Sequence, residues 1–172
     1  IPFYKNFLKQ FPTVKALAAA PLSEVLVAWQ GLGYNRRAKM LHNAAKEVVE
    51  KYGGTFPKSV TELEALPGIG PYTAGAVAAF AYNQDVIFIE TNIRTAVMHH
   101  LSAGKHTARS AQAARPILHL AKGLPASNIP DKEIMKILEK VFPVGKSREW
   151  YSALMDYGAH LKKSGVKINS RS

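Results

Sequence analysis

The chain has 172 residues, enough for one helical domain with a proper core or for two small lobes that share one. Its 23 Lys and Arg residues against 12 Asp and Glu give a net charge of +11, which favours nucleic acid first and an anionic membrane surface second as partners. The absence of cysteine excludes a disulfide framework and a thiolate metal site, and fits a reducing, intracellular location. A basic protein without a polyanionic partner is the alternative.

The spacing of apolar residues predicts a chain made almost entirely of helices. Helices are expected over residues 3–11, 13–20, from 21 to about 29, 36–52, a short one after Ser59, 71–82, 90–100, 131–142 and 146–163. Residues 105–130 are basic and rich in alanine, with a possible helix over 110–122, and residues 164–172 form a polar tail. No apolar run reaches the length of a membrane span. The first residue is Ile1 rather than Met, so we expect a piece of a longer protein.

The run Leu66-Pro-Gly-Ile-Gly-Pro-Tyr-Thr-Ala places a Gly-x-Gly turn between two helical segments. Pro71 suits the first position of the second helix, where the backbone N–H groups have no partner within the helix. Such a turn exposes N–H donors that can grip a phosphate of DNA and read its backbone rather than its sequence. An ordinary turn between two helices is the alternative for Gly68 and Gly70.

A single carboxylate, Glu90, follows the apolar run Val86-Ile-Phe-Ile and opens another helix. A carboxylate beside a deoxyribose carbon can stabilise the oxocarbenium-like state through which a base leaves its sugar. A carboxylate at a helix start is also stabilised by the helix dipole alone. Tyr72 and Asn92 stand two residues beyond the turn and the carboxylate respectively, where each could bond sugar, base or Glu90. Each could equally be a structural residue.

Tyr34 stands on the turn Gly31-Leu-Gly-Tyr-Asn, directly before Arg36 and Arg37. An aromatic ring there could wedge into a base stack while the arginines hold phosphate, or it could be a tyrosine at the edge of the core. The pair His99 and His100 has no acidic or cysteine partner at ligand spacing, so no metal site is predicted there.

Together these residues resemble the helix-hairpin-helix DNA glycosylase superfamily, the endonuclease III and adenine glycosylase group. Within this group, the chain most resembles the MutY-type adenine glycosylases, which remove adenine mispaired with 8-oxoguanine. It covers nearly the whole chain, through Ile1-Pro-Phe-Tyr, Phe11-Pro-Thr-Val, Pro21-Leu-Ser-Glu-Val-Leu, Gly31-Leu-Gly-Tyr, Leu66-Pro-Gly-Ile-Gly-Pro-Tyr-Thr-Ala-Gly-Ala, Glu90-Thr-Asn-Ile-Arg and Met155-Asp-Tyr-Gly-Ala.

The resemblance implies an all-α, two-lobed glycosylase domain over residues 1–172, with a helix-hairpin-helix motif at 66–73. It places a helical-barrel lobe at about 19–102, a second lobe at 1–18 and 103–163, and a tail at 164–172. The family's catalytic aspartate falls on Glu90, its following asparagine on Asn92, and the Schiff-base lysine of its bifunctional lyases on Tyr72. Tyrosine there implies a monofunctional enzyme that leaves an abasic site. The implied DNA contacts fall on Leu66, Gly68, Ile69, Gly70, Thr73, Tyr34, Arg36 and Arg37.

Three features depart from the family pattern. Glu90 replaces aspartate, and its extra methylene moves the charge by about 1.5 Å, where a misplacement of about 1 Å can cost about 100-fold in rate. The family's general-acid glutamate lies upstream of the segment that matches Ile1. The first cysteine of the family's iron–sulfur cluster falls on Lys162, and residues 163–172 hold no cysteine, so neither a cluster nor any other cofactor is expected.

The resulting expectation is a monomeric base-excision DNA glycosylase that acts on double-stranded DNA with a mismatched or damaged base, removes adenine opposite 8-oxoguanine or guanine, and has no membrane association. A thymine glycosylase for G·T mismatches is one alternative, since it also tolerates tyrosine at position 72. The other is a DNA-binding domain that lacks catalysis, which the missing general acid and the change to Glu90 favour. The basic stretch 105–122 is expected to add DNA contacts.

Overall fold

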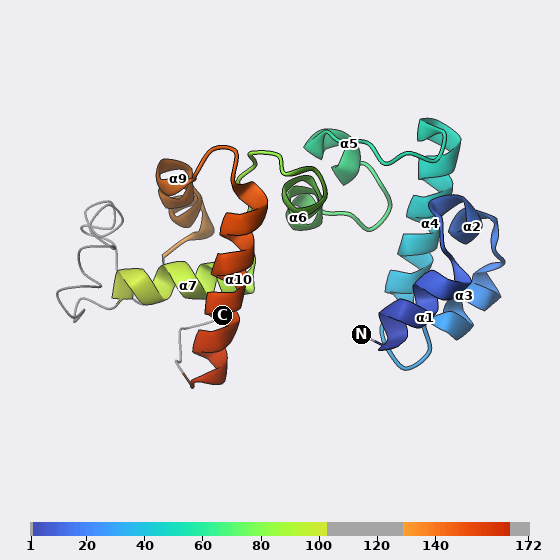
Figure 1. The fold of residues 1–172 in the computed structure, drawn as a ribbon, viewed down its shortest axis with the longest axis horizontal. Coiled ribbons are helices and arrows are strands. Elements are labelled where there is room, and N and C mark those ends of the chain that lie inside the picture. The colour runs from blue at the N-terminus through green and yellow to red at the C-terminus, as the bar shows by residue number, and fades with distance from the viewer. Residues whose placement is uncertain (1, 103–128, 166–172) are drawn as a thin grey trace. The chain divides into compact units, whose positions relative to one another are not determined.

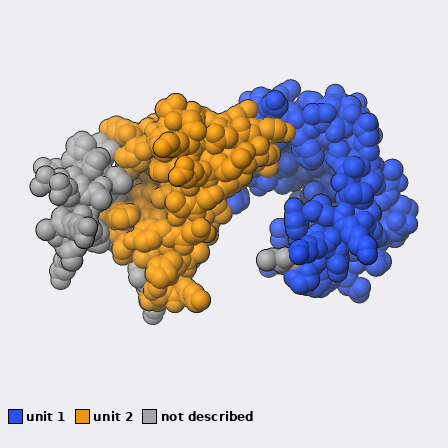
Figure 2. Space-filling view, viewed as in Figure 1, with its two compact units in different colours: residues 1–74 blue, residues 75–172 orange. Residues whose placement is uncertain are grey.

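The computed structural model describes residues 2–102 and 129–165, and every regular element in these residues is a helix (Figure 1). The helices are α1 (Pro2–Gln10), α2 (Val14–Ala19), α3 (Leu22–Ala28), α4 (Asn35–Tyr52), α5 (Val60–Glu64), α6 (Pro71–Tyr82), α7 (Thr91–Ser102), α9 (Asp131–Val141) and α10 (Ser147–Lys163). The chain divides into two compact units, residues 1–74 and 75–172, coloured separately in Figure 2. Each unit is described by itself. Among the described helices, none is both long and apolar enough to cross a membrane.

Unit 1 is built around α4, against which α2 and α3 pack. Thr13 begins α2 by accepting a hydrogen bond on its side-chain oxygen from the N–H of Ala16, and Gly53 ends α4 in the left-handed conformation. One core cluster of the unit consists of Phe11, Leu17, Val25, Ala38 and Ala45. His42, on the inner face of α4, is buried and its Nε2 lies 3.0 Å from the carbonyl oxygen of Ala20.

An open apolar groove of about 540 Å³ lies on unit 1, between α1, α2, the turn after α3, and α4. Several large apolar side chains in it are exposed, among them Phe3 (46%), Leu8 (43%) and Leu41 (37%). The amphipathic α1 therefore has an apolar face that its own unit covers only in part.

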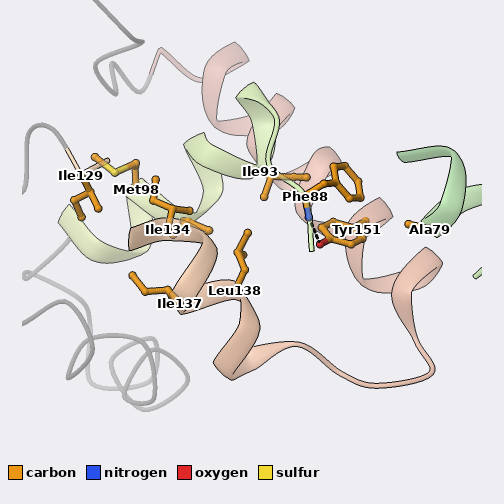
Figure 3. Packing of buried hydrophobic residues seen from close by; sticks show 10 residues of the cluster. Ala79, Phe88, Ile93, Met98, Ile129, Ile134, Ile137, Leu138 and Tyr151 are labelled. Atoms are coloured by element: carbon orange, nitrogen blue, oxygen red, sulfur yellow. Dashed lines mark hydrogen bonds between the residues drawn. The ribbon is translucent and has the colours of Figure 1, made fainter. Parts of the chain in front are cut away.

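Unit 2 holds most of α6 together with α7, α9 and α10, and its core is the larger cluster drawn in Figure 3. The buried members are Ala79, Phe88, Ile93, Val97, Met98, Ile129, Ile134, Ile137, Leu138 and Tyr151. Gly75 of α6 lies so close to Phe88 that an added Cβ would stand 2.7 Å from the Cβ of Phe88. The small residues of α6 thus allow the extended segment 83–90 to pack directly on that helix.

Polar contacts tie the start of α10 to the end of α6. The guanidinium of Arg148 donates to the carbonyl oxygens of Phe80 (2.7 Å) and Ala81 (3.1 Å), which find no N–H donor within α6 because they lie in its last turn. The carboxylate of Asp85 accepts from the N–H of Gly145 at 2.9 Å from each oxygen. These bonds hold the first residues of the segment 83–90, which ends at Glu90, against the start of α10.

The predicted all-α class is confirmed, and each helix predicted within the described residues is present with ends that differ by a few residues. The boundary between the compact units falls at residues 74 and 75, whereas the predicted lobes change at 18 and 102. The lobe boundaries therefore stay a prediction. The possible helix over 110–122, the DNA contacts of the stretch 105–122 and most of the predicted tail lie outside the described residues.

Candidate active site

The predicted hairpin consists of α5, a turn and α6. Ser59 begins α5, because its Oγ accepts from the N–H of Glu62 at 3.2 Å and its hydroxyl donates to the carboxylate of Glu62. Leu66 is buried and anchors the end of α5, and its carbonyl accepts from the N–H of Ile69 at 3.1 Å. Hydrogen bonds within the hairpin and the burial of Leu66 therefore fix α5 and the start of the turn.

The two glycines of the turn differ in what surrounds them. Gly68 has a φ of +76°, and a Cβ there would lie 2.5 Å from the Cβ of Met40 on α4, so both its backbone and its packing require glycine. Gly70 is exposed, and a Cβ there would meet nothing within 4 Å among the described residues. Of these two glycines, Gly70 is therefore the one that leaves space for a ligand among the described residues.

Backbone donors lie in that open space at the start of α6. Pro71 has no N–H, and within the described residues the N–H groups of Gly70 and Thr73 have no backbone acceptor. The positive end of the α6 dipole adds to these donors, a combination suited to an anion such as a phosphate. Tyr72 is 45% exposed at the second position of the same helix.

Tyr34 lies at the start of α4 in an unusual conformation. Its φ of 51° and ψ of 59° are left-handed, which costs a non-glycine residue about 1 kcal/mol, and its side chain is 83% exposed. The indole Nε1 of Trp29 donates to the carbonyl of Gly33 at 2.9 Å and holds this turn, while the guanidinium of Arg37 lies 5.7 Å from the Trp29 ring centroid. The turn projects the tyrosine outward beside Arg36 and Arg37, which are both exposed.

Glu90 ends the segment 83–90 and caps α7. Its Oε1 accepts from the N–H groups of Asn92 (2.7 Å) and Ile93 (2.9 Å), so both carboxylate and helix start are fixed. Within the described residues no hydrogen bond is made to its second oxygen, and the side chain is half-buried. The carboxylate thus combines the capping role with an oxygen that remains available for chemistry.

Asn92 is held by α10. Its Oδ1 accepts from the ammonium of Lys162 at 2.6 Å, and Gly158 of α10 lies directly against its backbone. Asn92 is predicted from the sequence as a site residue, whereas neither of these two contacts is. A glycine and a lysine four residues apart on one helix were the available signal, since such residues share a face.

The predicted residues therefore form groups within the units. Leu66, Gly68, Ile69, Gly70, Tyr72 and Thr73 share the hairpin of unit 1, and Tyr34, Arg36 and Arg37 share the start of α4 in the same unit. Glu90 and Asn92 are brought together in unit 2.

Within the part of the chain that the structure describes, no three His, Cys, Asp or Glu side chains lie together as a metal site requires. The ring nitrogen Nδ1 of His99 lies 3.0 Å from the hydroxyl of Tyr157 instead. The absence of any metal or cofactor stays a prediction.

Comparison with known proteins identifies the family. Residues 1–120 match the family described as HhH-GPD superfamily base excision DNA repair protein, and the chain belongs to this family. Among curated proteins, it is 33% identical over 98% of its length to the adenine DNA glycosylase of Buchnera aphidicola subsp. Baizongia pistaciae, and 47% identical over 56% of its length to that of Mycolicibacterium smegmatis. The chain spans 43% of the first relative and 33% of the second.

The solved structure of a thermostable thymine-DNA glycosylase has the same fold. It matches with a TM-score of 0.68 over 92% of this chain and 64% of its own, at 24% sequence identity. The likeness to this structure therefore extends to the fold.

Proposed function

We propose that this chain acts on double-stranded DNA as a monomeric, monofunctional glycosylase that removes adenine mispaired with 8-oxoguanine or guanine. The observation that carries the proposal is the carboxylate of Glu90, fixed through one oxygen and open at the other, at the start of α7. Curated relatives named adenine DNA glycosylase support adenine as the base. Such an enzyme would act in the cytoplasm or nucleoid, where the genome lies.

The reaction breaks the bond between C1′ of the deoxyribose and N9 of adenine. The target nucleotide must first leave the base stack, because the bond cannot be reached inside a duplex. The electron pair of the bond departs with adenine, which takes up a proton, and water then adds to C1′ and loses one. The open oxygen of Glu90 stabilises the positive charge that develops at C1′ and O4′ between these events.

The remaining site residues hold the DNA and the sugar. The N–H groups of Gly70 and Thr73 at the start of α6 bind a backbone phosphate, and Leu66, Gly68 and Ile69 shape the turn that presents them. Tyr34 enters the stack where the base has left, and Arg36 and Arg37 bind flanking phosphates. Asn92, beside Glu90, contacts the flipped nucleotide, and Tyr72, at the start of α6, contacts the DNA.

The test is a single-turnover assay on duplexes that carry adenine opposite 8-oxoguanine, adenine opposite guanine, or a G·T mismatch, each with and without alkali. We expect strand breaks at adenine only after alkali, because a monofunctional enzyme leaves an intact abasic site. Breaks at thymine would transfer the assignment to G·T mismatches. Breaks without alkali would contradict the monofunctional assignment.

The variant Glu90→Gln distinguishes a glycosylase from a domain that only binds DNA. The amide oxygen of Gln still caps α7, so folding and DNA binding persist, but the negative charge is lost and turnover should fall by about 100-fold or more. The exposed Glu139 of α9 provides the matched control, since Glu139→Gln removes the same charge away from the site. Full activity in Glu90→Gln would refute the role of Glu90, and binding without turnover in the parent chain would make it a binding module.

A further inference from the structure

Lys162 of α10 makes a hydrogen bond that fixes the direction of the Asn92 side chain. Its Nζ lies 2.6 Å from Oδ1 of Asn92. A lysine ammonium donates hydrogen bonds and accepts none, so the oxygen of the amide must face Lys162 and the NH₂ group must face away. Because the donor is charged, the bond is stronger than one between neutral groups.

Gly158 brings α10 close enough for that bond to form. It precedes Lys162 by four residues and therefore lies on the same face of the helix. A Cβ at position 158 would stand 2.1 Å from the carbonyl oxygen of Asn92 and 2.8 Å from its Cα, so the two backbones touch. Figure 1 shows α10 lying across α7 in unit 2. The glycine sets the distance, and the lysine one turn later reaches the side chain.

The same asparagine is bonded to the carboxylate. The backbone N–H of Asn92 donates to Oε1 of Glu90 at 2.7 Å, so one residue connects Lys162 to Glu90. Lys162 itself is exposed, and its removal leaves no cavity in the core. A side chain that contributes little to packing but determines which way a site amide faces has a functional rather than a structural effect.

We infer that Lys162 is a positioning residue for the glycosylase reaction: it holds the Asn92 amide so that the NH₂ group is presented to the nucleotide. The inference rests on the proposed function. Without the ammonium the amide can rotate, and only part of the population has the reactive orientation. The chemical step should slow while DNA binding persists, since Lys162 acts through Asn92 rather than on the phosphates.

The test compares Lys162→Met, which keeps the length and loses the donor, with Lys162→Arg, which keeps a charged donor. Lys163→Met is the control, because it removes the same charge from the neighbouring exposed residue. Under single turnover at saturating enzyme we expect Lys162→Met to slow adenine release about 3- to 10-fold with Kd changed by less than about twofold. Lys162→Arg should recover most of the rate, and Lys163→Met should match the parent.

A second measurement does not depend on activity. The side-chain amide signals of Asn92, assigned by their loss in Asn92→Asp, are followed by ¹⁵N NMR in the DNA-free protein. We expect Lys162→Met to move both signals toward those of a free asparagine, and Lys163→Met to leave them in place. Unchanged signals in Lys162→Met would overturn the inference.

The two measurements also distinguish failure of the inference about Lys162 from failure of the proposed function. A rise in Kd with an unchanged rate at saturation would make Lys162 a phosphate contact and overturn the inference. A parent chain inactive on all three duplexes would refute the proposed function. The inferred positioning role in catalysis would fall with it, even where the signals show that the amide is held.

Discussion

At the scale of single residues, the two glycines of the hairpin should respond oppositely to alanine. Gly68→Ala places a Cβ on left-handed backbone and against Met40, so we expect a loss of about 2–4 kcal/mol in the free energy of unfolding. Gly70→Ala meets no neighbour and should change stability by less than about 0.5 kcal/mol. Its methyl group, however, occupies the space in front of the N–H groups that we propose bind a phosphate.

DNA binding therefore distinguishes the two variants. Gly70→Ala should weaken DNA binding about tenfold, the equivalent of one hydrogen bond to a charged group. Urea unfolding and a fluorescence-anisotropy titration on the same samples give both quantities. A Gly70→Ala protein that binds DNA as the parent does would show that the phosphate is not held at this turn.

Glu90 has two interpretations in the sequence, of which the structure tests the first. The alternatives were a carboxylate that stabilises a helix start and one that stabilises a cation at the sugar. The structure confirms the first, since Oε1 accepts from two N–H groups of α7. The second stays a prediction, and it concerns the other oxygen of the carboxylate. The cap also fixes the Glu90 side chain, so the carboxylate has a defined position despite the methylene that an aspartate would lack.

At the scale of elements, Tyr151 of α10 locks the segment that carries Glu90. Its hydroxyl donates to the carbonyl of Val86 at 2.9 Å and accepts from the N–H of Phe88 at 3.1 Å, the bond dashed in Figure 3. Burial raises the pKa of Tyr151 from 10.0 to about 12. Between these values the unfolded chain has lost the proton that the folded chain keeps, so stability falls as pH rises through this range.

We expect Tyr151→Phe to change both the free energy of unfolding at neutral pH and its dependence on pH in alkaline solution. At neutral pH it should unfold more easily by about 1–3 kcal/mol, because two hydrogen bonds are lost. From pH 10 to about 12 its stability should fall less steeply than that of the parent, whose loss in that window is about 2 kcal/mol from this group. Urea unfolding at a series of pH values measures both, with Tyr4→Phe, at a 67% exposed position, as the control. Parallel alkaline slopes in parent and variant would contradict the assignment.

The elements themselves could be predicted because their signals are local. Helices begin at or directly after Thr13, Ser59 and Pro71, and one helix ends at Gly53. Contacts between helices could not be predicted in this way. The bond from Lys162 to Asn92 joins residues 70 apart in sequence, and it depends on α10 approaching α7 at Gly158. The spacing of Gly158 and Lys162 indicates a shared helix face, but it does not indicate which helix that face packs on.

At the scale of the whole molecule, the net charge of +11 predicts that the proposed binding to DNA depends strongly on salt concentration. Each phosphate neutralised by a cationic side chain releases counterions, so the logarithm of the binding constant falls linearly with the logarithm of salt concentration. A charge that touches phosphate contributes to this slope. A charge elsewhere acts only through the general field, which salt screens within about 10 Å at 0.1 M.

Two cations on α4 allow that distinction to be tested within one helix. Arg36 is exposed in the first turn beside Tyr34, whereas Lys51 is bonded to Glu47 in the last turn, about 22 Å away along the axis. Arg36→Gln and Lys51→Gln each lower the net charge by one. We expect Arg36→Gln to reduce the slope by about 0.9 and Lys51→Gln to leave it within error of the parent. Anisotropy titrations over a range of salt concentrations measure the slopes. Equal reductions in the two variants would mean that this chain attracts DNA through its overall charge, with no phosphate held at the start of α4.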